Sequence, residues 1–205
     1  MTESKRIKGK SNARSDATMV SLKKSVPTKR EVAETEAASS VQIDLFVLRH
    51  GEAGNRMAVA KEDSERPLTT QGRTEMLKIA KSLRGVGLKA KCVYTSPLRR
   101  ARETAEIVAK ILNIPLLQEW DELKPIGNKA LLYRKIARHE QGSRLILVGH
   151  EPYLTSMIGD IIGNANTRLV LKKGGIGKVR INSFEPRISG ELRWLLTPKM
   201  IIKMS

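Results

Sequence analysis

The chain has 205 residues, enough for one domain of ordinary size with a full hydrophobic core and terminal segments besides. Lys and Arg outnumber Asp and Glu by 38 to 21, which favours anionic partners. Aromatic residues make up only 3% of the chain and offer few platforms for base stacking, so a nucleic-acid partner is disfavoured. The single cysteine excludes an intrachain disulfide, and no apolar stretch approaches the ~20 residues of a membrane span. We therefore expect a soluble protein of the cytoplasm with no membrane partner.

Residues 1–40 are rich in Ser, Thr, Lys, Arg and Glu and show no sustained apolar period. Such a segment cannot bury enough surface to offset the entropy lost on ordering, so we predict a disordered basic tail followed by one domain at residues 41–205. Acidic residues in the tail argue against a transit peptide. Contact of the tail with an acidic surface is an alternative to a purely solvated tail.

From residue 41 onward, apolar runs typical of strands alternate with segments of helical periodicity. Gly, Pro and Ser residues mark the boundaries, with Ser96 as the expected cap and Pro97 in the first turn of the second helix. The expected elements are, in chain order, a strand at 41–48, a helix from about 67 to 85, a strand at 90–95, a helix from 96 to 114, a short strand at 116–117, a helix at 129–139, a strand at 145–148 and a helix from 152 to 163.

The last part of the chain has a different pattern. Short apolar segments at 169–171, 178–181 and 191–196 predict antiparallel strands at an edge of the sheet, with Gly174 and Gly175 shaping a hairpin. The strand and helix alternation before them predicts an α/β fold with a mostly parallel sheet.

Basic residues and histidines follow three of the predicted strands. Arg49 and His50 come directly after the first, Arg99 and Arg100 follow the second, and His150 follows the strand at 145–148. In a parallel sheet the carboxyl ends of the strands meet at one edge, so these side chains can converge on one crevice. Guanidinium groups match the oxygens of a phosphoryl group, and a neutral imidazole whose pKa is lowered by neighbouring positive charges can attack phosphorus.

Four motifs carry a resemblance to a known family. In order and spacing the chain resembles the histidine phosphatase superfamily at Leu48-Arg49-His50-Gly51-Glu52, Arg66-Pro67-Leu68-Thr69, Ser96-Pro97-Leu98-Arg99-Arg100-Ala101 with Thr104-Ala105, and Val148-Gly149-His150-Glu151-Pro152. Within that superfamily it resembles the SixA-type phosphohistidine phosphatases in its short length and at Asp121-Glu122-Leu123-Lys124-Pro125, Lys173-Gly174-Gly175 and Gly190-Glu191-Leu192-Arg193-Trp194. The resemblance covers residues 41–202. It implies the phosphoglycerate-mutase-like fold, a three-layer α/β/α sandwich.

The resemblance also implies roles for individual residues. His50 would be the nucleophile that becomes phosphorylated, and Arg49, Arg100 and His150 would hold the phosphoryl oxygens. Arg99 would then lie at the rim or face solvent. Arg66 would either reach the pocket rim or form a structural ion pair.

The glycine after the nucleophile, Gly51, is explained by close approach of its backbone to the phosphate or by a positive φ angle. The identity of the proton donor stays open. Glu122 is the first candidate after the third strand and Asp121 the second, and Asp63 resembles an acidic position of the SixA-type loop. A surface or ion-paired role is the alternative for each carboxylate. We expect no metal site and no cofactor, since the strand ends lack clustered carboxylates.

The substrate implied by the resemblance is phosphohistidine, most plausibly on a protein partner. An imidazole leaving group, with a pKa of about 6.5, needs far less protonation than an alkoxide. The alternatives are a phosphomonoesterase for a small metabolite or nucleotide, a phosphate-binding regulator without turnover, and a basic scaffold whose tail binds nucleic acid. The oligomeric state stays open at this point.

Overall fold

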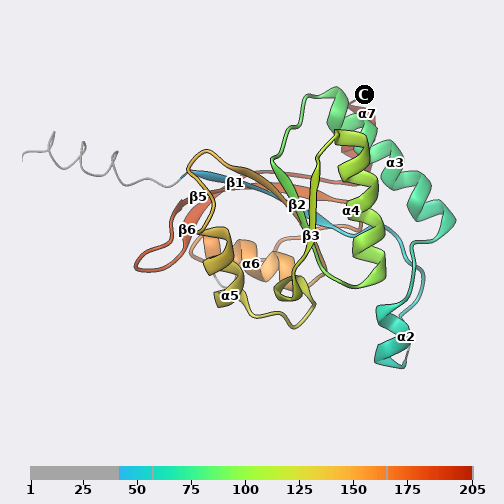
Figure 1. The fold of residues 1–205 in the computed structure, drawn as a ribbon, viewed down its shortest axis with the longest axis horizontal. Helices are drawn as coiled ribbons and strands as arrows, with labels where there is room; N and C mark the ends of the chain where they lie inside the picture. Colours follow the sequence, from blue (N-terminus) through green and yellow to red (C-terminus); the bar gives the residue numbers. More distant parts are fainter. Residues whose placement is uncertain (1–41, 57, 165, 205) are drawn as a thin grey trace, which may run out of the picture. The chain divides into compact units, whose positions relative to one another are not determined.

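The structure, a computed structural model, describes residues 42–56, 58–164 and 166–204; the tail predicted at residues 1–40 lies outside them. In this part of the chain, strands form one mixed sheet in the order β3-β2-β4-β1-β5-β6 (Figure 1). The strands are β1 (Ile43–Arg49), β2 (Cys92–Thr95), β3 (Leu116–Glu119), β4 (Arg144–Gly149), β5 (Ile176–Ser183) and β6 (Ser189–Leu196). β1 to β4 are parallel, whereas β5 is antiparallel to both of its neighbours, β1 and β6.

Helices cover both faces of the sheet (Figure 1). One core cluster joins the sheet to α3 (Thr70–Gly85), α4 (Arg99–Leu112) and α7 (Pro198–Lys203), and the other joins it to α5 (Lys129–Ile136) and α6 (Tyr153–Ile161). Two short helices lie in loops, α2 (Ala60–Ser64) and the 3-10 helix η1 (Asp121–Leu123). The predicted α/β/α sandwich with a mostly parallel sheet and antiparallel strands at one edge is confirmed.

The central strand β1 shows why this sequence forms a sheet buried on both faces. Ile43, Leu45 and Val47 pack under α5 and α6, whereas Phe46 and Leu48 pack under α3, α4 and α7. Successive side chains of a strand point to opposite faces, so a continuous apolar run is what a doubly covered strand requires. The carboxyl end of this run carries Arg49 and His50.

The strand predicted at 169–171 is wrong, and Gly174 and Gly175 do not form a hairpin between strands. The carbonyl of Leu171 accepts a hydrogen bond from Arg49, and the backbone N–H of Gly174 donates to the carbonyls of Arg49 and His50. This segment is therefore tied to the end of β1 as a turn and does not pair as a strand.

The start predicted for the second helix is also wrong. α4 begins at Arg99 with Leu98 as its N-cap, so Ser96 and Pro97 lie before the helix. The helix predicted to reach residue 139 ends at Ile136. Two helices were not predicted: α2, which has no buried residue and so no apolar period, and α7, which Thr197 caps.

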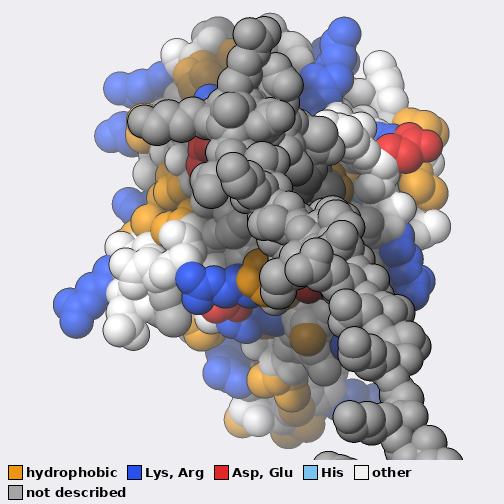
Figure 2. All heavy atoms as spheres, turned by 90° about the vertical axis from the view of Figure 1, so that its left-hand side faces the viewer, with side chains coloured by type: hydrophobic (Ala, Val, Ile, Leu, Met, Phe, Trp, Pro, Cys, Tyr) orange, Lys and Arg blue, Asp and Glu red, His pale blue; other side chains and the backbone are white. Residues whose placement is uncertain are grey.

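On the face drawn in Figure 2, Lys and Arg predominate over Asp and Glu without gathering into one patch. Within the described ranges, no helix is both long and apolar enough to cross a membrane.

Candidate active site

Four side chains from the ends of three parallel strands line one pocket: Arg49 at the end of β1 and His50 just after it, Arg100 in the first turn of α4 after β2, and His150 after β4. The two imidazole rings are nearly buried, with 5% of His50 and 2% of His150 exposed. Their ring centroids lie 5.0 Å apart. The structure thus brings the predicted convergent groups together at the carboxyl edge of the sheet.

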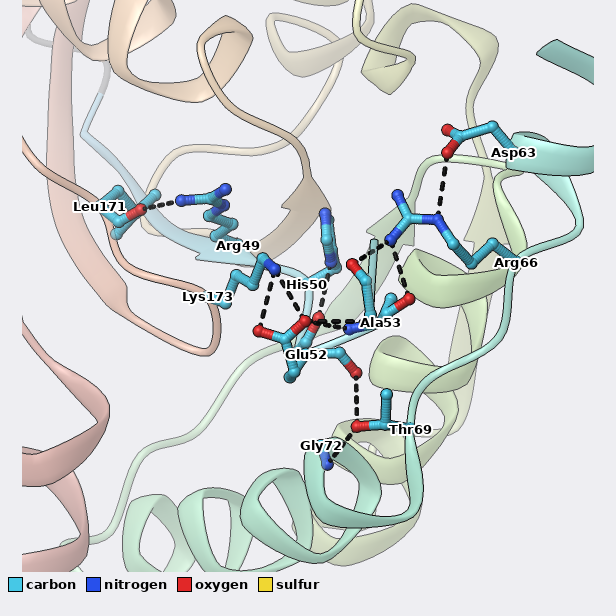
Figure 3. Close-up of polar contacts among 12 residues, drawn as sticks. Arg49, His50, Glu52, Ala53, Asp63, Arg66, Thr69, Gly72, Leu171 and Lys173 are labelled. Carbon is cyan, nitrogen blue, oxygen red and sulfur yellow. Dashed lines mark hydrogen bonds and ion pairs between the residues drawn. The ribbon is translucent and has the colours of Figure 1, made fainter. Parts of the chain in front are cut away.

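The tautomer of His50 follows from its hydrogen bond. Nδ1 lies 2.7 Å from the carbonyl oxygen of Gly51, which can only accept, so Nδ1 carries the hydrogen and Nε2 keeps a free lone pair (Figure 3). Burial lowers the pKa of His50 to about 3, and the charges of Arg100, Arg49 and Lys173 act in the same direction. Burial, and not the neighbouring charge expected from the sequence, is thus the main cause of a neutral, nucleophilic ring.

Gly51 holds His50 in place and does not line the pocket. Its N–H donates to the hydroxyl of Thr104, which in turn donates to the carbonyl of Arg100. The φ angle of Gly51 is not positive, and a Cβ there would lie 2.6 Å from Cγ of Met76. The positive φ angle predicted for this glycine is therefore wrong, and the packing of α3 leaves no room for a side chain. The close approach of its backbone to the phosphate stays a prediction.

The two arginines are each anchored at one end. Arg49 Nη1 donates to the carbonyl of Leu171 at 2.9 Å, and Arg100 Nη1 donates to the carbonyl of Asp63 at 2.8 Å. The Nε atoms of both are buried and have no hydrogen-bond partner among the described residues. A buried donor without a partner is costly, and a phosphoryl oxygen is a suitable acceptor for each.

His150 is held by a serine that precedes α4. Its Nε2 lies 2.8 Å from Oγ of Ser96, and Oγ also accepts from the backbone N–H of Leu98. With Ser96 donating its own hydrogen to Nε2, the neutral ring carries its hydrogen on Nδ1, which is buried and unpartnered within the described chain. Burial, followed by the charges of His50 and the two arginines, lowers the pKa of His150 to about 2. His150 can therefore donate to an anion without being charged.

Arg66 both reaches the pocket and forms an ion pair, the two roles that the sequence left open. It lines the pocket, and its Nε lies 3.0 Å from the carboxylate of Asp63. Its Nη1 donates to the carbonyls of Ala53 and Gly54 (Figure 3). Asp63 also lies 3.4 Å from Arg100 Nη1, so its carboxylate is shared by two guanidinium groups.

Glu122 and Arg99 lie outside the pocket. Oε2 of Glu122 is 2.6 Å from Nζ of Lys135, in an ion pair at the end of β3. The geometry therefore does not support Glu122 as the proton donor. Arg99 is 46% exposed and pairs with Glu103, which agrees with the solvent-facing position expected for it.

Glu151 is a pocket residue that the sequence analysis did not consider. Its Oε2 accepts a hydrogen bond from the hydroxyl of Thr155, and its Oε1 is buried with no partner in the described segments. Burial raises the pKa of this carboxyl above its usual range. A signal was present, since Glu151 directly follows His150 and so lies at the same strand end.

Lys173 was also missed. It lines the pocket and forms an ion pair with Glu52, with distances of 2.8 and 2.9 Å from Nζ to the two carboxylate oxygens (Figure 3). Among the described residues there is no group of three or more His, Cys, Asp or Glu side chains that could hold a metal ion. The pocket thus presents one nucleophilic nitrogen surrounded by hydrogen-bond donors, an arrangement suited to transferring a phosphoryl group to His50.

Comparisons with known proteins agree with this geometry. The family model of the histidine phosphatase superfamily (branch 1) matches residues 45–131. An uncharacterised protein of Picosynechococcus is 36% identical over 78% of this chain and 99% of its own length. The phosphohistidine phosphatase SixA of Escherichia coli is 28% identical over 76% of this chain and 94% of its own length.

A solved structure of the protein histidine phosphatase SixA, complexed with tungstate, is similar to the fold. It superposes with a TM-score of 0.67 at 28% identity and covers 76% of this chain and 97% of its own. The phosphoserine phosphatase of Entamoeba histolytica has a TM-score of 0.59 at 16% identity, a likeness of fold, over 77% of this chain and 98% of its own.

Proposed function

Since the chain belongs to the histidine phosphatase superfamily, we propose that it is a phosphatase whose substrate is phosphohistidine carried by a protein. The observation that carries the proposal is the set of buried nitrogens around one pocket. Nε2 of His50 has a free lone pair with which it can attack phosphorus. Three other nitrogens are buried donors without partners in the described chain: Nε of Arg49, Nε of Arg100 and Nδ1 of His150. They can bind the oxygens of one phosphoryl group.

The reaction has two steps. In the first, Nε2 of His50 forms a bond to phosphorus while the bond from phosphorus to the substrate nitrogen breaks, and the electron pair of that bond stays on the leaving imidazole. In the second, water attacks the phosphorylated His50, phosphate leaves, and the electron pair returns to Nε2. Arg49, Arg100 and His150 stabilise the charge on the phosphoryl oxygens in both steps.

Two considerations favour phosphohistidine over a phosphate ester. When the other ring nitrogen of phosphohistidine carries a hydrogen, the ring leaves as neutral imidazole, whose conjugate acid has a pKa of about 6.5, and it departs with little assistance. The SixA relative of Escherichia coli is named a phosphohistidine phosphatase, and this chain matches 94% of the length of that relative.

The surroundings of the pocket favour a substrate carried by a protein. A neighbouring hollow shares Arg56, Asp63, Pro125 and Ile126 with the phosphoryl pocket, and Ile126 exposes 95% of its side chain. Free phosphohistidine is too small to cover the pocket and this hollow together. A polypeptide around the phosphorylated histidine could bury Ile126 and gain ~1–2 kcal/mol from that contact.

The test is a comparison of turnover on a phosphohistidine protein, free phosphohistidine and phenyl phosphate, with wild type and His50→Ala. We expect kcat/KM at least about a hundredfold higher for the protein than for the small substrates, since remote contacts lower the barrier. His50→Ala should lose about 10³-fold or more on all three. Ile126→Ser should slow cleavage of the protein substrate only. Preference for the ester, or full activity of His50→Ala, would contradict the proposal.

A further inference from the structure

The carboxyl groups around the pocket differ in their partners. Asp63 is shared by Arg66 and Arg100, and Glu52 pairs with Lys173. Glu151 also lines the pocket, yet no salt bridge joins it to a cation within the described part of the chain. It is the pocket carboxyl that is not already committed to an ion pair.

The environment of Glu151 favours its neutral form. Oε1 is buried without a partner, and the hydrogen bond to Oε2 comes from the uncharged hydroxyl of Thr155. The loss of water around the carboxyl raises its pKa, while the hydrogen bonds from Thr155 and the charge of Arg49 oppose that shift in part. A neutral carboxyl group can donate a proton, whereas the carboxylate of Asp63 is already held between two guanidinium groups.

The position of Glu151 in the chain puts it beside the reacting groups. It directly follows His150, whose ring centroid lies 5.0 Å from that of His50, and it lines the same pocket. The other ionisable side chains that line this pocket are Arg49, His50, Arg56, Asp63, Arg66, Arg100, His150 and Lys173.

We propose that Glu151 is the proton donor of the reaction. As the bond between phosphorus and the leaving atom breaks, the carboxyl proton passes to that atom. The resulting carboxylate then accepts a proton from the water that attacks phosphorylated His50, which restores the acid. This assignment rests on the proposed phosphatase activity and holds for an ester as well as for phosphohistidine.

The experiment measures the rate of the first step in single turnovers with two aryl phosphates, for wild type, Glu151→Gln and Glu122→Gln. Phenyl phosphate releases a basic phenolate, with a pKa of about 10 as in tyrosine, and needs a proton. Nitrophenyl phosphate releases a weakly basic anion and does not. Glu151→Gln should slow phenyl phosphate cleavage about 100-fold or more and nitrophenyl phosphate cleavage less than about fivefold. Glu122→Gln, whose carboxylate pairs with Lys135 outside the pocket, should slow neither.

Equal slowing of both esters by Glu151→Gln, or no slowing of either, would overturn the assignment. A second readout does not depend on turnover: in infrared difference spectra between wild type and Glu151→Gln, taken over a pH series, the C=O band of the neutral carboxylic acid should persist above the pKa of about 4.3 of an ordinary Glu. Loss of that band at or below the ordinary pKa would overturn the assignment too. Failure of the proposed substrate class would look different, as absent turnover of phosphohistidine with the ester series unchanged.

Discussion

At the scale of single residues, each of the four groups that we assign to the reaction is fixed at one atom and free at another. The carbonyl of Gly51 accepts a hydrogen bond from His50 Nδ1, and the hydroxyl of Ser96 is hydrogen-bonded to His150 Nε2. Backbone carbonyls accept hydrogen bonds from one nitrogen of each arginine. The free atoms, Nε2 of His50 and the unpartnered nitrogens of the other three, belong to one pocket. Preorganised donors of this kind need no rearrangement when charge develops.

Arg100 and Arg99 provide a matched pair for testing this. Arg100→Ala should lower kcat/KM by about 10²–10³-fold, because it removes charged hydrogen bonds worth about 1.5–3 kcal/mol each. Arg99→Ala, one residue away, should change it by no more than about twofold, since Arg99 is 46% exposed and bound to Glu103. Steady-state kinetics on either small substrate provide the measurement. Similar losses in the two variants would mean that the wrong guanidinium has been assigned to the pocket.

At the scale of elements, the loop after β1 is held in place by the start of α3. The carbonyl of Glu52 accepts the backbone N–H of Thr69, and Gly72 packs so closely that a Cβ there would lie 2.2 Å from the same oxygen. The contact is between the backbone of Gly72 and the backbone of Glu52, so no flexible side chain could move away to make room for a Cβ. The contact fixes the segment that carries His50.

Gly72→Ala should therefore destabilise the protein by about 1–3 kcal/mol, because the helix must shift away from the loop. Gly85→Ala, at the other end of α3, is the control: nothing lies within 4 Å of its Cβ position and its φ is not positive. That substitution should be neutral or stabilise by up to about 1 kcal/mol. Urea unfolding of both variants gives the free energies. A harmless Gly72→Ala would show that α3 does not constrain the loop.

The elements also show what a sequence can reveal. Apolar periodicity located the central strands and α3, and the strand-end rule placed Arg49, His50, Arg100 and His150 at one edge. Hydrogen bonds between distant parts of the chain set two features that periodicity could not predict. The carbonyl of Leu171 accepts a hydrogen bond from Arg49, and its segment does not form a strand. The hydroxyl of Ser96 is hydrogen-bonded to His150, and Ser96 does not cap α4. Glu122 and Glu151 both follow strands, but Glu122 pairs with Lys135 outside the pocket and Glu151 lines it, and the ion pair of Glu122 could not be read from the sequence.

At the scale of the whole molecule, burying two neutral histidines makes folding sensitive to acid. Their pKa values in the folded state, about 3 for His50 and about 2 for His150, lie below the value of about 6.5 in an unfolded chain. Below pH 6.5 the unfolded chain takes up protons that the folded protein does not. The free energy of unfolding therefore falls as pH falls from about 6.5 toward 3.

The slope should reach about 1.4 kcal/mol per pH unit for each ring. Carboxylates such as Asp44, whose pKa is lowered mainly by Arg180 and Lys178 against the effect of burial, also destabilise the fold in acid. The double variant His50→Gln, His150→Gln isolates the histidine contribution. Its free energy of unfolding should fall less steeply than that of wild type in urea titrations at pH 7, 6, 5 and 4. Parallel slopes would show that the two rings titrate normally in the fold.

The most direct test of the account is to trap the phosphorylated enzyme. A radiolabelled small phosphohistidine is mixed with the protein, the reaction is quenched in base, where phosphohistidine is stable, and the labelled residue is located by peptide mass spectrometry. The account predicts label on His50, absent from His50→Ala and present on Arg99→Ala. Label on another residue, or turnover with no labelled enzyme at any time, would contradict it.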